Sequence, residues 1–147
     1  MSGINRWCFV AVVILGSGVG HAARIDKGEG RLKLVEAEPH DELTTVTITT
    51  MSADGKFLYA SSFGIATLNV YARDTKTGLL RNTQTITDQE VLAGASDIAI
   101  SPDGRMAVAT GFQSQTVVLY TRNSETGELR QADVAHDDEN TNRSMPA

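Results

Sequence analysis

The 147-residue chain is poor in several residue types, and each shortage excludes a class of protein. One Cys cannot form a disulfide within the chain, so covalent cross-links do not hold its fold. The 13 Lys and Arg residues are outnumbered by 18 Asp and Glu, and an acidic chain lacks the clustered cations that nucleic acid requires. With 41% hydrophobic and only 21% charged residues, the composition differs from that of a disordered tail. We therefore expect a folded protein without a nucleic-acid partner.

The N-terminal segment has the pattern of an export signal. Arg6 is followed by the unbroken apolar run Trp7–Leu15, and then by small residues in which Gly20 and Ala22 suit a signal-peptidase site. The run is shorter than the about 20 residues of a membrane-spanning helix. We predict a signal peptide over residues 1–22, cleaved after Ala22, a secreted or periplasmic location, and no membrane attachment afterwards. An uncleaved anchor or a buried strand is the alternative.

A repeat organises the remaining chain. Ser52–Arg81 and Ser101–Arg130 align without a gap at an offset of 49, and 12 of the 30 aligned positions are identical. A partial copy comes first, because Gly30–Glu42 resembles Gly127–Glu139. The chain therefore consists of the end of one repeat followed by two full repeats, and repeats of this length indicate an array of small structural units.

Each repeat predicts four short strands. Asp-Gly pairs at 54–55 and 103–104 predict tight hairpins, and β-branched alternation is typical of the strands. Residues 31–37 predict one extra strand, equivalent to the fourth strand of a repeat. Residues 88–95 predict at most a single helical turn. The predicted strands, in order within each repeat, are 46–51 and 97–100, 57–62 and 106–110, 67–72 and 116–121, and 80–86 and 129–135.

The repeat resembles a known structural unit. Ser101–Arg105, the Tyr-x-Arg at Tyr120–Arg122 and the Glu-Thr-Gly-x-Leu at Glu125–Leu129 resemble one blade of the lactonase-type, 6-phosphogluconolactonase-like seven-bladed β-propellers. The resemblance implies an all-β fold of two four-stranded antiparallel blades plus one extra N-terminal strand, a partial propeller. The implied divisions are an N-terminal segment at 23–43, one blade at 44–92, a second at 93–139 and a polar tail at 140–147.

Members of that family close about seven blades, whereas this chain holds two. Open blades leave apolar faces and strand edges uncovered. Three explanations stay open. The chain is a truncated propeller, or three or four copies associate to close a ring, or it forms a small β-assembly that does not close.

The loops between second and third strands and the exits of the fourth strands are expected at one end of the blades. They carry candidate ligand-binding residues, and the alternative is a solvated acidic rim in which Phe63 and Phe112 pack between blades. Two His-acid clusters are weak metal candidates, too compact to define a ligand set, and we predict no metal site and no cofactor. The ligand-face candidates are Asp41, Glu42, Phe63, Asp88, Glu90, Phe112, Gln113 and Gln115, and the metal candidates are His40, Asp41, His136 and Asp137.

No catalytic set is evident. A Gly-x-Ser-x-Gly motif and a P-loop are absent from the sequence. Ser52 and Ser101, beside Asp-Gly, are expected to bond local backbone. The arginines that recur with the repeat are expected to have a structural role, such as pairing with carboxylates at the periphery of the blade; they are Arg73, Arg122, Arg81 and Arg130. We predict a binding or scaffold protein, or a truncated propeller, with an unknown small-molecule or protein ligand. The alternative is a lactone hydrolase, a carboxylic-ester hydrolase active only as an oligomer or in a longer parent chain.

Overall fold

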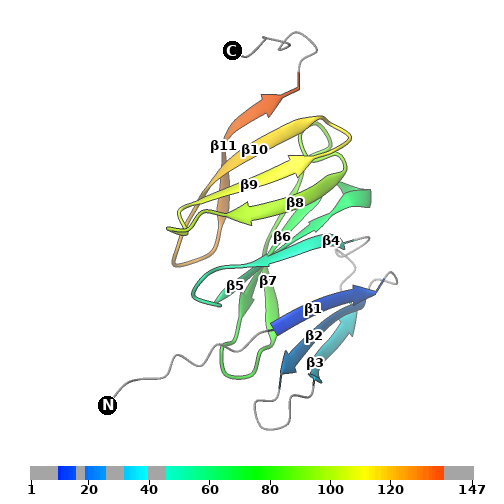
Figure 1. Cartoon of the computed structure of the whole chain (residues 1–147), viewed down its shortest axis with the longest axis vertical. Coiled ribbons are helices and arrows are strands. Elements are labelled where there is room, and N and C mark those ends of the chain that lie inside the picture. Colours follow the sequence, from blue (N-terminus) through cyan, green and yellow to red (C-terminus); the bar gives the residue numbers. More distant parts are fainter. Residues whose placement is uncertain (1–9, 16–18, 26–31, 40–45, 138–147) are drawn as a thin grey trace, which may run out of the picture.

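The computed structural model describes residues 10–15, 19–25, 32–39 and 46–137. Three antiparallel sheets follow one another along the chain, and the middle sheet lies between the other two (Figure 1). Among the described residues the one helical element is the short 3₁₀ turn η1, Phe63–Ile65, and no helix is long and apolar enough to cross a membrane.

Two four-stranded sheets match the two full repeats and confirm the predicted fold class. Blade 1 has the strand order β4-β5-β6-β7, and blade 2 has the corresponding order β8-β9-β10-β11. The strand ends differ from the prediction by at most two residues. The bounds are β4 Val46–Met51, β5 Phe57–Ser62, β6 Thr67–Arg73, β7 Leu80–Thr87, β8 Ala95–Ile100, β9 Met106–Gly111, β10 Thr116–Arg122 and β11 Leu129–His136.

The N-terminal sheet contains more strands than the sequence predicted. The expected strand at 31–37 is β3 (Leu32–Pro39), and it pairs with β2 (Val19–Ile25), which pairs with β1 (Val10–Leu15). The β2–β3 register shifts between Ala22 and Ala23, as the β6–β7 register shifts between Val70 and Tyr71. The sheet thus repeats the last three strands of a blade. The apolar run that the sequence predicts as a signal core contains β1, and a strand was the alternative for this run.

Serine and aspartate fix the first hairpin of each blade. The Ser52 hydroxyl donates to Asp54 Oδ1 at 2.6 Å and accepts the Phe57 N–H at 3.0 Å. Ser101 makes the same two bonds in blade 2. The glycines that follow, Gly55 and Gly104, both have φ of 70°, a conformation that glycine adopts without strain. The prediction that these serines are turn residues is confirmed.

The main core lies between the two blades. The trailing face of blade 1, the side towards blade 2, carries Phe57, Tyr59, Leu68 and Val70. It packs in one cluster with the leading face of blade 2, the side that a blade turns towards the preceding sheet in the chain. That face carries Ala107, Ala109, Val118 and Tyr120. Alternate residues of a strand point to opposite faces, so each blade can pack against a neighbour on both sides.

The two blades differ in how much of their surface is covered. All six residues of β5 are buried, because blade 1 has a sheet on either side (Figure 1). On the trailing face of blade 2, Val108 is 37% exposed and Val117 is 46% exposed, whereas their blade 1 equivalents Tyr59 and Leu68 are fully buried. The expected uncovered apolar face is therefore the trailing face of blade 2.

Candidate functional site

Backbone bonds tie the loop after the second strand to the exit of the fourth strand in both blades. The Asp137 N–H donates to the Gln115 carbonyl at 2.9 Å, and the Asp88 N–H donates to the Ala66 carbonyl at 3.1 Å. Gln115 and Ala66 adopt φ of 53° and 52°, a left-handed conformation that is uncommon for residues other than glycine. The loop and the strand exit therefore form one fixed corner in each repeat.

At this corner of blade 2 lies an open hollow of about 810 Å³. Five of the residues that the sequence singled out line it together. Phe112, Gln113 and Gln115 come from the loop between β9 and β10, and His136 and Asp137 come from the exit of β11. Phe112 is 72% exposed, the largest exposed fraction among the exposed large hydrophobic residues of the described chain. The expectation that these two segments meet at one end of the blade agrees with this geometry.

Sequence reasoning missed the floor of the hollow. Ser96 and Thr110 face each other across β8 and β9, with hydroxyl oxygens 3.0 Å apart, and Val117 adds an apolar side chain. Thr116 also lines it, and its hydroxyl donates to the Val91 carbonyl at 2.6 Å. The alternation of strand residues could have placed Thr110 and Val117 on one face, but not beside the loop. The hollow thus combines amides, hydroxyls, one aromatic ring and a rim of His and Asp.

The remaining candidates lie elsewhere. The Asp88 carboxylate accepts the backbone N–H groups of Glu90 and Val91, so it caps the single turn predicted at 88–95. Glu90 is exposed and does not line the hollow. The rings of Phe63 and Phe112 lie 6.5 Å apart at 34°, the contact that the inter-blade packing alternative expects. The candidates His40, Asp41 and Glu42 lie outside the described residues.

The geometry offers no metal centre within the described ranges. No three His, Cys, Asp or Glu side chains there are grouped to hold an ion. His136 and Asp137 are exposed neighbours at the rim of the hollow.

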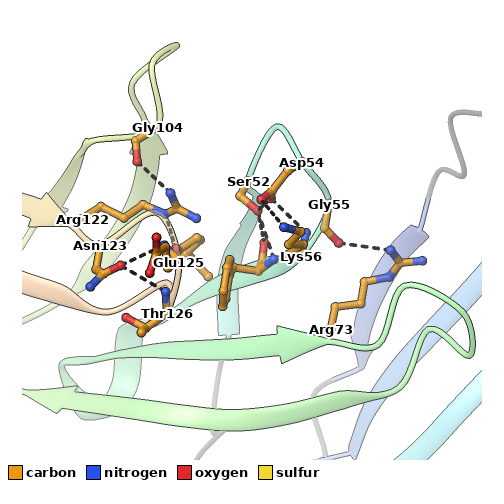
Figure 2. A network of polar contacts seen from close by, with 12 residues as sticks. Ser52, Asp54, Gly55, Lys56, Arg73, Gly104, Arg122, Asn123, Glu125 and Thr126 are labelled. Atoms are coloured by element: carbon orange, nitrogen blue, oxygen red, sulfur yellow. Dashed lines mark hydrogen bonds and ion pairs between the residues drawn. The ribbon is translucent and has the colours of Figure 1, made fainter. Parts of the chain in front are cut away.

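The recurring arginines Arg73 and Arg122 have a structural role, and among the described residues the hydrogen bonds of their Nη1 atoms go to backbone carbonyls. Arg73 Nη1 donates to the Gly55 carbonyl at 3.1 Å, and Arg122 Nη1 donates to the Gly104 carbonyl at 2.7 Å (Figure 2). Each guanidinium therefore secures the first hairpin of its own blade. The hairpin glycine has no side chain, which leaves its carbonyl accessible to the long arginine side chain.

Arg122 also joins blade 2 to blade 1. Its Nε donates to the Tyr59 hydroxyl, and its guanidinium lies 5.4 Å from the centroid of the Phe57 ring. The Tyr59 hydroxyl in turn donates to the Gly127 carbonyl at 2.9 Å. Burial raises the pKa of Tyr59, although Arg122 opposes that shift. These groups are occupied by the blade junction, so they are not available to a ligand. Fold and site together define a β-propeller repeat protein with an open, mainly apolar hollow that carries several polar side chains.

The chain belongs to the family of seven-bladed β-propeller lactonases, whose family model matches residues 22–141. It is similar in structure to the periplasmic gluconolactonase of Pseudomonas aeruginosa, with a TM-score of 0.71 and 20% identity over 82% of this chain and 34% of that one. It is also similar to a candidate 6-phosphogluconolactonase of Bacteroides uniformis, with a TM-score of 0.69 and 24% identity over 79% and 33%. The chain thus spans about a third of the solved structures it matches. No curated protein matches it significantly.

Proposed function

We propose that this protein is exported and binds a small, neutral, polyhydroxylated molecule of the sugar-lactone class in the hollow of blade 2. One observation carries the proposal: the loop residues Phe112, Gln113 and Gln115 and the strand-exit residues His136 and Asp137 line the same hollow. Ligand pockets combine apolar or aromatic surface with a few converging polar groups, and this lining has both.

The chemistry of the lining favours a neutral ligand. The side-chain amides of Gln113 and Gln115 can donate and accept hydrogen bonds, as sugar hydroxyls and a lactone carbonyl require. The exposed Phe112 ring offers apolar surface that the C–H face of a sugar ring would cover. The net charge of −5 disfavours anionic ligands, since a negative protein repels them at long range. One of the similar structures is described as a gluconolactonase, a name that denotes action on a lactone of this class.

Export rests on the N-terminal pattern. Arg6, the apolar run Trp7–Leu15 and the small residues up to Ala22 have the order of a cleavable signal. The family match begins at residue 22, at the proposed cleavage site, and one similar structure is described as periplasmic. Cleavage after Ala22 would remove β1 and divide β2. Intact mass of the exported chain tests this directly, because a mass that includes residues 1–22 would refute cleavage.

Binding is tested by titrating glucono-1,5-lactone and gluconate into the protein by calorimetry or by NMR. The decisive variant is Gln113→Gly with Gln115→Ala, which installs the residues that blade 1 carries at Gly64 and Ala66 in the same loop conformation. We expect this variant to fold normally and to bind the lactone at least about tenfold more weakly, the loss of one net hydrogen bond.

A matched control separates the hollow from the rest of the surface. Gln131 is an exposed glutamine on β11 that does not line the hollow, so Gln131→Ala should bind as the unchanged chain does. Equal weakening by both variants, or no lactone binding at all, would refute the binding site.

Lactone hydrolysis is the second candidate, favoured by His136 at the rim of the hollow beside Asp137. Imidazole can accept a proton from water near neutral pH, which is the task of a general base in ester hydrolysis. A pH-stat assay with a protein-free blank measures it. Turnover that disappears in His136→Ala would support the enzyme, and a rate equal to the blank would refute it.

A further inference from the structure

Blade 1 and blade 2 carry the same docking groups at positions 49 residues apart. On blade 2, Tyr120, Arg122 and Leu129 lie on the leading face and pack against blade 1. On blade 1, the equivalent residues are Tyr71, Arg73 and Leu80, and Tyr71 lies in a second buried cluster with Leu58 and Ala60. The leading face of blade 1 is thus built as the leading face of blade 2 is, towards the N-terminal sheet (Figure 1).

The complementary face is open at the other end of the molecule. The trailing face of blade 1 buries Tyr59 and Leu68 completely against blade 2, but the trailing face of blade 2 leaves Val108 and Val117 exposed at those positions. The two full blades therefore form one complete junction, and blade 2 carries one half of a further junction. The leading face of blade 1 would supply the other half.

We propose that the mature protein associates head to tail, with the leading face of blade 1 of one copy docking on the trailing face of blade 2 of the next. The proposal rests on the cleavage proposed above, because removal of residues 1–22 takes away β1 and four residues of β2, which lie on the leading side of blade 1 (Figure 1). A second copy is the occupant because the same junction, between the same residue positions, already exists within each chain. Such a contact joins two different surfaces, so repetition closes a ring when the rotation permits, here of three or four copies.

The junction between copies would lack several polar contacts of the junction within the chain. Within the chain the Tyr59 hydroxyl makes two of them, and Gln84 bonds both backbone groups of Leu129, at 2.9 and 2.8 Å. On blade 2 the equivalent of Gln84 is Asp133.

Arg122 Nε has the Tyr59 hydroxyl as its partner, whereas the buried Arg73 Nε has none within the described part of the chain. The position equivalent to Tyr59 on blade 2 is Val108, which cannot accept a hydrogen bond. Val108→Tyr would supply the hydroxyl to Arg73 of the next copy and place it beside the carbonyl of Gly78, the equivalent of Gly127.

Docking would also enclose the hollow. In blade 1 the equivalents of the floor residues Thr110 and Val117 are Ser61 and Leu68, which blade 2 covers completely. The equivalents of the rim residues His136 and Asp137 are Thr87, which is exposed, and Asp88, which is half-buried. Of the equivalents of Gln113 and Gln115, Gly64 is exposed and Ala66 is buried. A docked copy would therefore cover the floor of the hollow and leave its rim accessible, which would place the proposed ligand between two copies.

The test measures association of the exported chain by sedimentation velocity and native mass spectrometry. We expect discrete oligomers of three or four cleaved chains at concentrations well above micromolar. Val108→Tyr should tighten association at least about tenfold, the gain of one hydrogen bond to a charged group. Val108→Phe should gain less, and adding Arg73→Leu to Val108→Tyr should remove the gain. Val108→Lys should weaken association at least about tenfold, because it buries an unpaired charge.

A matched control uses Leu79, which is 47% exposed in the turn between β6 and β7 and lies on neither docking face. Leu79→Lys should leave association unchanged. A cleaved chain that stays monomeric, or aggregates that respond equally to the Leu79 and Val108 variants, would overturn the docking and leave the cleavage intact. A chain that keeps residues 1–22 after export would overturn both, since β1 then keeps its place beside blade 1.

Discussion

The Tyr59 hydroxyl links the two blades, and its removal should be costly. It accepts a hydrogen bond from Arg122 Nε and donates one to the Gly127 carbonyl at 2.9 Å. In Tyr59→Phe the ring still fills its place, but both partners stay buried without a bond. Each buried group left unsatisfied costs about 1–3 kcal/mol. We therefore expect Tyr59→Phe to lower the free energy of unfolding by about 2–6 kcal/mol.

The same substitution at Tyr120 provides the matched control. Tyr120 is 1% exposed in the same core, and its hydroxyl oxygen is buried with no partner in the described part of the chain. Tyr120→Phe removes a desolvated hydroxyl and no hydrogen bond. We expect it to be neutral or to raise the free energy of unfolding by about 1 kcal/mol. One chemical change in one core should thus have opposite effects at the two positions.

Urea unfolding followed by circular dichroism measures both effects, provided that the m-value stays the same in all three proteins. Unchanged m-values mean that the shift in midpoint reports stability alone. The reasoning fails if the two Phe variants unfold within about 0.5 kcal/mol of each other, since that is the scale of ordinary surface substitutions. A destabilised Tyr120→Phe would equally show that its hydroxyl has a partner.

Three further predictions concern single groups. Gly127→Ala should destabilise the fold more than Gly104→Ala, measured by thermal unfolding, because both have positive φ but only the Cβ at Gly127 would lie 2.3 Å from an aromatic carbon of blade 1. Burial raises the pKa of Tyr120 to about 12, so its contribution to stability is present below pH 10 and lost as the pH rises towards 12. Ultraviolet titration should show Tyr120 ionising at a higher pH than a free tyrosine does. The hydrogen bond from Ser101 lowers the pKa of Asp103. The contribution of Asp103 to the free energy of unfolding is therefore present above pH 3.8 and lost as the pH falls through the lowered pKa. NMR titration should show the pKa of Asp103 rising in Ser101→Ala.

The sequence predicted the blades well because their signals are local. Alternation fixed β6 and β10, and the Asp-Gly pairs marked the first hairpins. Identity between Tyr71 and Tyr120 indicated equivalent core positions, and both side chains are 1% exposed. A repeat that aligns without a gap carries such information twice, so an error in one copy would have conflicted with the other.

Contacts between blades were not predictable in the same way. Nothing local to Arg122 indicates that its Nε bonds the hydroxyl of Tyr59, 63 residues earlier in the chain. The carbonyls that Arg73 and Arg122 bond were not predictable either, because an arginine can be satisfied by backbone carbonyls, and a carbonyl carries no sequence signal. The floor of the hollow was missed for a similar reason, since Thr110 and Val117 become neighbours of the loop only once the sheet has formed.

The comparison of the two repeats also separates framework from site. Positions that hold the blade together are identical in both copies, as Tyr71 and Tyr120 or Arg73 and Arg122 are. Most positions that line the hollow differ between the repeats. Among them, Gln113, Gln115 and His136 stand where blade 1 has Gly64, Ala66 and Thr87. A side chain required by the blade itself is required in every blade, whereas a side chain that contacts a ligand is needed only once. The divergent corner of blade 2 is therefore where binding specificity is expected, on a framework that the rest of the repeat keeps constant.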